Sequence, residues 1–232
     1  MRIGSKTDKG RVREQNEDSY GYRANLFVVA DGMGGHEAGE VASGIAVETI
    51  LKAALQPDIA AALEQAVLQA NEAILEETDR HPAYQGMGTT VAVLVLEGSR
   101  AYITHVGDSR IYRWSAGSAQ LEQLTDDHSL VAELVKNGGL TAAEAQTHPQ
   151  RNILTRALGT RGLAEMEIKR IPADPGDKFL LCSDGLSGLV QEDELRALIG
   201  AAEPPQQIVE RLVDLANERG GNDNITAILI EI

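Results

Sequence analysis

Along the first half of the chain, a short run of β-prone apolar residues is followed by two longer runs with helical periodicity and then by further β-prone runs. Residues 27–30 are continuously apolar, which predicts a short buried strand, and the Asp-Gly-Met-Gly-Gly that follows predicts a tight turn. Alanine, valine, isoleucine and glutamate then recur at helical spacing. We therefore expect one helix over residues 37–55 and a second, opened by Pro57, that runs to residue 79.

Three β-prone runs occupy the middle of the chain: TTVAVLVLEG, SRAYITHVGDS and RIYRWSAG. Turn residues at 97–99 and 107–109 separate these runs, which predicts an antiparallel meander of strands joined by hairpins. The β pattern stops over residues 125–159, where two short helical segments are predicted, the second opened by Thr141 with Glu144 placed for a capping box. We interpret this stretch as an inserted flap.

The elements predicted in the last third of the chain are strands at 166–171, 178–182 and 225–230 and a helix at 205–219. Because strands and helices do not alternate regularly, their order favours an α+β fold over a parallel doubly wound sheet. We expect a four-layer α-β-β-α sandwich with two central antiparallel sheets. A single domain over residues 1–232 would carry the flap at 125–159.

The composition is that of a globular protein, with 43% hydrophobic and 24% charged residues. No apolar run approaches the ~20 residues that span a bilayer, and the polar N-terminus lacks the apolar centre of a signal peptide. We therefore expect a cytoplasmic protein without membrane contact. The 21 basic and 35 acidic residues give a net charge of −14, which opposes binding to nucleic acid. The single Cys182 lies in an apolar strand, where a small buried hydrophobe is expected.

Three aspartates from remote segments lie at the ends of predicted strands: Asp31 and Asp184 follow apolar runs, and Asp223 precedes the last strand. Carboxylates gathered within a few ångströms cannot all stay ionised unless a positive charge lies among them. No cluster of lysine or arginine is close in sequence, so a divalent cation is the expected neutraliser. Oxygen ligands with glycine backbone nearby favour Mg²⁺ or Mn²⁺ over zinc.

Seven motifs resemble, in order, those of the metal-dependent type-2C protein phosphatases in their compact bacterial form. They are RVREQNEDS, VVADGMGGHEAGEVAS, GMGTT, HVGDSRIY, LTDDHS, LLCSDGL and GNDNIT, and the resemblance covers residues 11–232. It implies that Asp31 bridges two metal ions with the carbonyl of Gly32 beside it. It also implies that Asp184 and Asp223 complete the ligands of the first ion.

The resemblance further assigns roles within the segment RVREQNED. Glu17 and Asp18 become candidates for the second metal, bound directly or through its waters. Asp18 is favoured because many bacterial members carry glutamine in place of Glu17, for which a solvated surface role stays open. Arg13 matches the arginine that holds the substrate phosphate, and a planar guanidinium suits this role because it can bond two phosphate oxygens.

Two further aspartates match family motifs. Asp127 of TDDHS matches a carboxylate that helps to bind a third metal beside Asp184, although Asp126 competes for this role and a helix N-cap is an alternative. Asp108 of HVGDS is expected to brace a turn near the site.

The loop after Asp31 departs from the animal members of the family, which carry histidine where this chain has Met33. That histidine is proposed to protonate the leaving group, whereas a thioether has no proton to donate. His36 lies three residues on, but a structural role suits it equally well, and a metal-bound water is another source of the proton. The general acid is therefore left unassigned.

The resemblance implies a Mg²⁺- or Mn²⁺-dependent enzyme that hydrolyses phosphoserine and phosphothreonine in proteins through a metal-bridging hydroxide. Its partners would be phosphorylated proteins and a bacterial Ser/Thr kinase that it opposes, and a monomer is expected. A cysteine-dependent mechanism is excluded, because it needs arginine six residues beyond Cys182, where this chain has Gly188. Two alternatives stay open. One is a non-catalytic phosphoprotein-binding module, disfavoured because every matched aspartate is kept, and the other is a phosphatase specific for an anti-sigma-factor antagonist.

Overall fold

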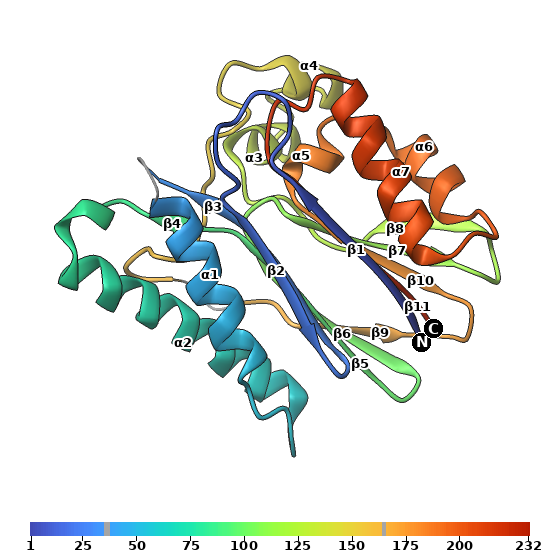
Figure 1. The fold of residues 1–232 in the computed structure, drawn as a ribbon, viewed down its shortest axis with the longest axis horizontal. Coiled ribbons are helices and arrows are strands. Elements are labelled where there is room, and N and C mark those ends of the chain that lie inside the picture. The colour runs from blue at the N-terminus through green and yellow to red at the C-terminus, as the bar shows by residue number, and fades with distance from the viewer. Residues whose placement is uncertain (35–37, 164–165) are drawn as a thin grey trace.

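Two antiparallel β-sheets face each other at the centre of the molecule (Figure 1). The structure is a computed structural model and describes residues 1–34, 38–163 and 166–232. The first sheet has the strand order β1 (Arg2–Asp8), β11 (Ile225–Glu231), β10 (Lys178–Cys182), β7 (Arg110–Ser115) and β8 (Gln120–Gln123). The second has the order β2 (Asp18–Arg23), β3 (Leu26–Met33), β5 (Val91–Glu97), β6 (Arg100–Val106) and β9 (Lys169–Pro172), with β4 (Gly88–Thr89) paired to β3. The helices are α1 (Ala38–Leu51), α2 (Ile59–Arg80), the 3₁₀ turn η1 (Pro82–Tyr84), α3 (Leu130–Lys136), α4 (Ala142–Thr147), α5 (Asp184–Ser187), α6 (Glu192–Ile199) and α7 (Pro205–Glu218).

The helices form the outer layers of the sandwich. Helix α1 packs on β2 and β3 of the second sheet with α2 beside it, and α7 packs on β1 and β11 of the first sheet. Helices α3 and α4 belong to the stretch between β8 and β9 and lie at one end of the sandwich (Figure 1). This arrangement confirms the predicted α+β sandwich of two antiparallel sheets.

Strand β3 contributes to two layers of the core. Leu26, Val28 and Ala30 pack against the residues of α1 and α2, while Phe27 and Val29 pack against residues of the opposite sheet. All five side chains are buried. Because successive side chains of a strand point to opposite faces, a strand covered on both faces needs apolar residues at every position. This explains the continuously apolar run in the sequence.

The predicted meander is wrong at its second turn. Strands β5 and β6 form the expected hairpin, but β6 belongs to the second sheet and β7 to the first. Residues 107–109 therefore carry the chain from one sheet to the other. Gly107 has a φ of 101°, a conformation that favours glycine, and a Cβ added there would lie 2.6 Å from the side chain of Thr90. A hairpin and a crossing between sheets have the same local turn residues, so the sequence did not separate them.

The two long helices are present with shifted boundaries. Helix α1 ends at Leu51, and its predicted start at Glu37 lies outside the described residues. Pro57 precedes α2 rather than opening it, because the side chain of Asp58 accepts the backbone N–H groups of the first turn and caps the helix.

Several elements were not predicted from the sequence. Strands β1, β2 and β8 lie at the edges of their sheets, where partial exposure admits polar residues and weakens the apolar pattern. Helix α5 is too short for a period to be recognised, and the short α6 was also missed. In the predicted flap, by contrast, the capping box of Thr141 and Glu144 is confirmed.

The crossing at Gly107 generates a stability prediction. We expect Gly107→Ala to lower the free energy of unfolding by about 2–4 kcal/mol, because the left-handed backbone and the contact with Thr90 both oppose a Cβ. Gly98→Ala is the matched control, since Gly98 also has a positive φ but open space around an added Cβ, and about 1 kcal/mol is expected there. Urea titration measures both values, and equal losses would contradict the role of the close contact.

Candidate metal centre

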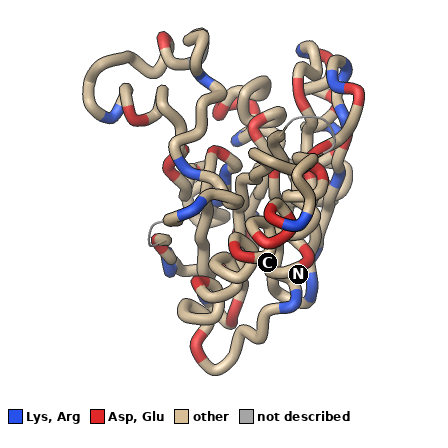
Figure 2. Tube along the Cα trace, turned by 90° about the vertical axis from the view of Figure 1, so that its left-hand side faces the viewer, with Lys and Arg blue, Asp and Glu red and all other residues tan. Residues whose placement is uncertain are grey.

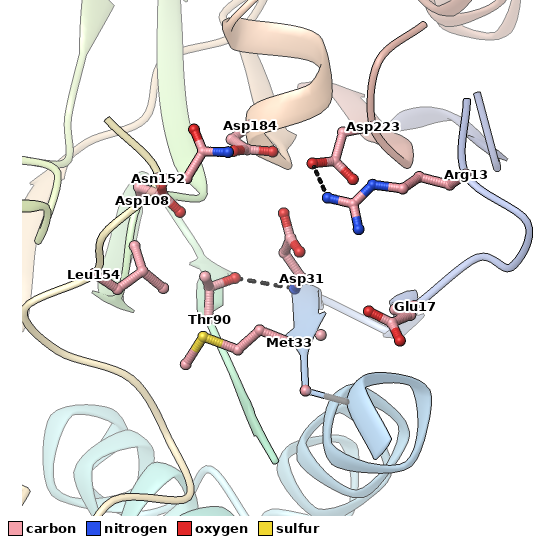
Figure 3. A pocket seen from close by; sticks show the side chains of 12 residues that line it. Arg13, Glu17, Asp31, Met33, Thr90, Asp108, Asn152, Leu154, Asp184 and Asp223 are labelled. Atoms are coloured by element: carbon pink, nitrogen blue, oxygen red, sulfur yellow. Dashed lines mark hydrogen bonds and ion pairs between the residues drawn. The ribbon is translucent and has the colours of Figure 1, made fainter. Parts of the chain in front are cut away.

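A cavity of about 230 Å³ opens at one end of the sandwich. Segments far apart in the chain line it (Figure 3): Arg13, Glu17, Asp31, Gly32, Met33, Gly34, Thr90, Asp108, Asn152, Leu154, Asp184 and Asp223. All of the predicted site residues except Asp18 and Asp127 belong to this lining.

The backbone of Asp31 is fixed by the threonines of the GMGTT motif. The N–H of Asp31 donates to Thr90 Oγ1 at 2.9 Å, and its carbonyl accepts from the N–H of Thr90 and from the hydroxyl of Thr89, each at 2.9 Å. Thr90 Oγ1 also lies 2.7 Å from Ser109 Oγ. These contacts hold the end of β3 rigidly, and nothing in the sequence assigned this role to the motif.

Asp184 and Asp223 lie at the ends of two neighbouring strands of the other sheet, β10 and β11. Asp184 is the first residue of α5 after β10, and Asp223 directly precedes β11, which pairs with β10 in antiparallel register. The two carboxylates therefore lie at the same end of the sandwich and point toward Asp31 (Figure 3). Arg13 Nη2 donates to Asp223 Oδ2 at 2.8 Å, which directs the guanidinium toward the cavity.

Asn224 holds the segment that carries Arg13 and Glu17. Its Nδ2 donates to the carbonyls of Lys9 at 3.0 Å and of Gln15 at 2.8 Å, and its Oδ1 accepts the N–H of Glu17 at 2.8 Å. The side chain is buried, so these bonds fix both ends of the segment against the start of β11. The GNDNIT motif was noted in the sequence, but this residue was given no role.

Glu17 and Asp18 occupy different environments. Glu17 lines the cavity, whereas Asp18 is buried and accepts a hydrogen bond from Ser183 Oγ at 2.7 Å. The second oxygen of Asp18, Oδ1, has no hydrogen-bond partner among the described residues. Glu17 thus lies in the cavity lining and Asp18 lies outside it, and which of the two contacts an ion directly stays a prediction.

Asp108 and Asp127 also differ from their expected places. Asp127 forms a two-point ion pair with Arg110, with Nε–Oδ1 at 2.9 Å and Nη2–Oδ2 at 2.7 Å, and it is absent from the cavity lining. Asp108, expected to brace a turn, lines the cavity with Asp184. The sheet crossing at residues 107–109, which the sequence did not reveal, brings Asp108 to this position.

Burial and mutual repulsion disfavour ionisation of these carboxyls. Burial raises the pKa of Asp18 and Asp108 to about 7 and that of Asp184 to about 6, with the charges of neighbouring aspartates acting in the same direction. Burial and the charges of Asp18 and Asp184 raise the pKa of Asp31 well above its usual range. Burial also raises the pKa of Glu17.

The donor set fits a hard divalent cation. The donors are carboxylate oxygens, and Oδ1 of Asp184 and Oδ1 of Asp18 are buried without a partner among the described residues. A cation among these groups would offset the repulsion that raises their pKa values. In the described part of the chain, no three His, Cys, Asp or Glu side chains already stand at metal-binding distances from one another, so the ligand set stays a prediction.

The cavity offers no assigned proton donor. Met33 lines it, but its thioether has no proton, and His36 lies outside the described residues. Cys182 is buried within β10 and burial raises its thiol pKa to about 12, as for a packing residue. The general acid therefore stays unassigned.

A two-sheet sandwich with oxygen ligands gathered at one end is suited to a metal-dependent hydrolase. A family model described as protein phosphatase 2C matches residues 10–229. The serine/threonine phosphatase stp of Listeria monocytogenes is 37% identical over 100% of this chain and 96% of its own length. PstP of Mycobacterium tuberculosis is 38% identical, and the chain spans 45% of that longer protein. The chain belongs to the protein phosphatase 2C family, as its motifs predicted.

Solved structures agree with this assignment. The crystal structure of Mycobacterium tuberculosis PstP/Ppp superposes with a TM-score of 0.93 at 37% identity, covering 100% of this chain and 98% of that one. The catalytic domain of PstP in complex with two manganese ions has a TM-score of 0.90 at 36% identity, covering 99% of this chain and 97% of that one.

The raised carboxyl pKa values generate a prediction for metal binding. Because the folded-state pKa values exceed the unfolded value of about 4, metal-free protein loses stability as the pH rises from about 4 to about 7. Mn²⁺ must displace the protons that these carboxyls retain. The rise in the Tm of the protein on adding Mn²⁺ should therefore be small at pH 5.5 and large at pH 8. Differential scanning fluorimetry measures this, with Asp31→Asn as the control that loses the response. Equal Mn²⁺ shifts at both pH values would contradict it.

A second prediction concerns the three hydrogen bonds by which the Asn224 side chain holds residues 9–17. Asn224→Asp keeps the acceptor for Glu17 but sets a carboxylate oxygen against the carbonyls of Lys9 and Gln15, which should cost about 2–4 kcal/mol. We expect a lower midpoint in urea and a fall in kcat/KM, because Arg13 and Glu17 lose their placement. Asn222→Asp adds the same charge at an exposed neighbouring position and should leave both unchanged. If the two variants behave alike, the hydrogen bonds of Asn224 do not place Arg13 and Glu17.

Proposed function

We propose that this chain hydrolyses phosphoserine and phosphothreonine in proteins with the help of Mg²⁺ or Mn²⁺. One observation carries the proposal: Asp31, Asp184 and Asp223 converge in one cavity, with the Arg13 guanidinium directed into it. The predicted enzyme class agrees with relatives named serine/threonine phosphatases, and the predicted cofactor agrees with the relative that holds two manganese ions.

The chain's own residues would divide the work of holding the ions. Asp31 lies between the two sides of the cavity and suits a bridging ligand, with the carbonyl of Gly32 beside it. Asp184 and Asp223 belong to one side and Glu17 to the other. When bound, the ions supply an activated water as nucleophile and offset negative charge on the phosphoryl group.

A third metal is best supported beside Asp184 and Asp108. Both line the cavity, and the charge of Asp184 contributes to the raised pKa of Asp108. Asp127 contributes to the same shift but is already neutralised by Arg110. We therefore propose Asp108 as the carboxylate that cooperates with Asp184, and a structural role for the ion pair of Asp127.

Arg13 would bind the substrate phosphate and orient it. Its ion pair with Asp223 uses one terminal nitrogen and leaves the other N–H groups of the guanidinium for phosphate oxygens. The side chain is 47% exposed, so an incoming phosphoprotein can reach it. Asp223 thus serves both as a candidate metal ligand and as the group that aims the arginine.

The cellular setting extends the proposal. We infer a bacterial enzyme that opposes a Ser/Thr kinase and acts in the cytoplasm as a monomer. We also infer that residues 1–232 form one catalytic domain with its flap at residues 125–159. The bacterial origin of the relatives supports a bacterial enzyme, and their alignment with the whole of this chain supports the single catalytic domain. In the described residues, no helix combines the length and the apolar character needed to cross a bilayer. A non-catalytic binding module is disfavoured because the acidic lining is intact.

The proposal predicts metal-dependent turnover that fails without Asp184. Phosphate release from a phosphothreonine peptide should require Mn²⁺, stop with EDTA and return when Mn²⁺ is added back. Asp184→Asn should lower kcat/KM about 100-fold or more, because a charged ligand is lost while the shape is kept.

Asp193→Asn is the matched control for this variant, since Asp193 is a 92% exposed aspartate on α6, and full activity is expected there. Circular dichroism checks that both variants fold. Sustained release in EDTA, or normal activity of Asp184→Asn, would overturn the proposed function.

A further inference from the structure

Most basic side chains of this acidic protein are already engaged by ion pairs, hydrogen bonds or aromatic rings. Those without any such contact in residues 1–34, 38–163 and 166–232 are Lys9, Arg11, Arg100, Lys136, Arg151 and Arg156. Figure 2 shows acidic and basic residues interspersed along the chain, as expected for mutually compensating surface charges. The uncompensated cations need a separate explanation.

Two short segments hold most of these cations. Residues 9–13 contain Lys9, Arg11 and Arg13, and residues 148–156 contain Arg151 and Arg156. Neither segment contains an aspartate or glutamate, although the chain has 35 acidic residues against 21 basic ones. Such a distribution places positive charge locally on a protein whose net charge is −14.

Both segments border the cavity of the candidate metal centre. Arg13 ends the first segment, and Asn152 and Leu154 lie within the second; all three line the cavity. Figure 3 shows Arg13 on one side of Asp31 and Asn152 with Leu154 on the other. The two segments therefore lie on either side of the place where a phosphorylated side chain would enter.

The first segment is fixed in this position. The backbone N–H of Arg11 donates to the carbonyl of Gly221 at 2.8 Å, and Gly10 approaches so closely that an added Cβ would lie 2.2 Å from the carbonyl oxygen of Asp223. Arg11 is thus held against the loop that carries Asp223, and its side chain is exposed.

The second segment is fixed on the opposite side. Leu154 pairs with Ser129, and the N–H of Thr155 donates to the carbonyl of His128 at 2.9 Å. Arg151 and Arg156 flank this bridge and are exposed. Their side chains make no ion pair among the described residues, so their charges remain available to a ligand.

We propose that the two segments, residues 9–13 and 148–156, form a basic rim that selects phosphoproteins carrying acidic residues on both sides of the phosphorylated serine or threonine. This inference rests on the proposed function and adds a substrate class to it. Carboxylates of an extended substrate would pair with Lys9 and Arg11 on one side and with Arg151 and Arg156 on the other. The phosphate itself would remain with Arg13 and the metal centre. Such exposed pairs are individually weak and screened by salt, so selection would come from their sum.

The test compares phosphothreonine peptides of equal length whose flanks are acidic on the N-terminal side, acidic on the C-terminal side, acidic on both sides, or lysine throughout. The Mn²⁺-loaded enzyme is assayed for kcat/KM on each, with p-nitrophenyl phosphate as a substrate without flanks. We expect the doubly acidic peptide to exceed the lysine peptide by roughly tenfold at low salt, with the ratio falling at about 0.5 M salt.

Charge-reversal variants assign the two sides of the rim. Arg11→Glu should reduce the preference for acid on one flank by about threefold, and Arg151→Glu should do so for the other flank. Arg100→Glu is the matched control, because Arg100 is equally unpaired but lies on the β5–β6 hairpin, at the end of β5 remote from the cavity. Its flank preferences should equal those of the parent. All three positions are exposed, so folding should be unaffected.

The outcomes separate this inference from the proposed function. A parent enzyme that hydrolyses all peptides and p-nitrophenyl phosphate, but without preference for acidic flanks, overturns the basic rim and leaves the phosphatase intact. Equal loss of preference in Arg100→Glu and Arg11→Glu also overturns the rim. No release from any substrate with Mn²⁺ overturns the proposed function and the rim together.

Discussion

Repulsion between buried carboxylates is the constraint on which this structure depends. Asp18, Asp31, Asp108 and Asp184 lie close enough to act on one another, and burial together with like charge raises their pKa values. An arrangement of this kind opposes folding unless protons or cations neutralise it. The rest of the protein, two sheets with three layers of apolar core, must supply the stability that the site removes.

The scaffold meets this constraint by fixing backbone rather than side chains. Thr89 and Thr90 hold the end of β3, and Asn224 holds the segment that carries Arg13 and Glu17. These neutral groups make hydrogen bonds to backbone, so they add no charge to the cavity and leave carboxylate oxygens free for a cation. A site built in this way is rigid before any ligand arrives, which suits reactions that depend on positioning.

Charge is also divided between the cavity and its surroundings. The lining of the cavity is acidic and suited to cations. At the border of the cavity, Arg13 forms an ion pair with Asp223, whereas Arg11 and Arg151 are unpaired among the described residues. Away from the cavity, most arginines of the described residues pair with acidic neighbours, as Arg113 does with Asp177, although Arg100 is unpaired. A net charge of −14 therefore describes the surface as a whole and not the entrance to the site.

The sequence by itself determined the elements with a strong local period, namely the buried strand at residues 27–30 and the long helices. It also made Asp31, Asp184 and Asp223 candidate metal ligands, because each lies at the end of a predicted strand. Tertiary structure alone decided which strands pair. Residues 107–109 have the composition of a hairpin turn but cross between sheets, and this crossing brings Asp108 rather than Asp127 to the cavity. Whether Glu17 or Asp18 faces the cavity, and which backbone groups Asn224 binds, also depend on contacts between distant segments. Periodicity and turn chemistry are local properties, whereas pairing and burial depend on the whole chain.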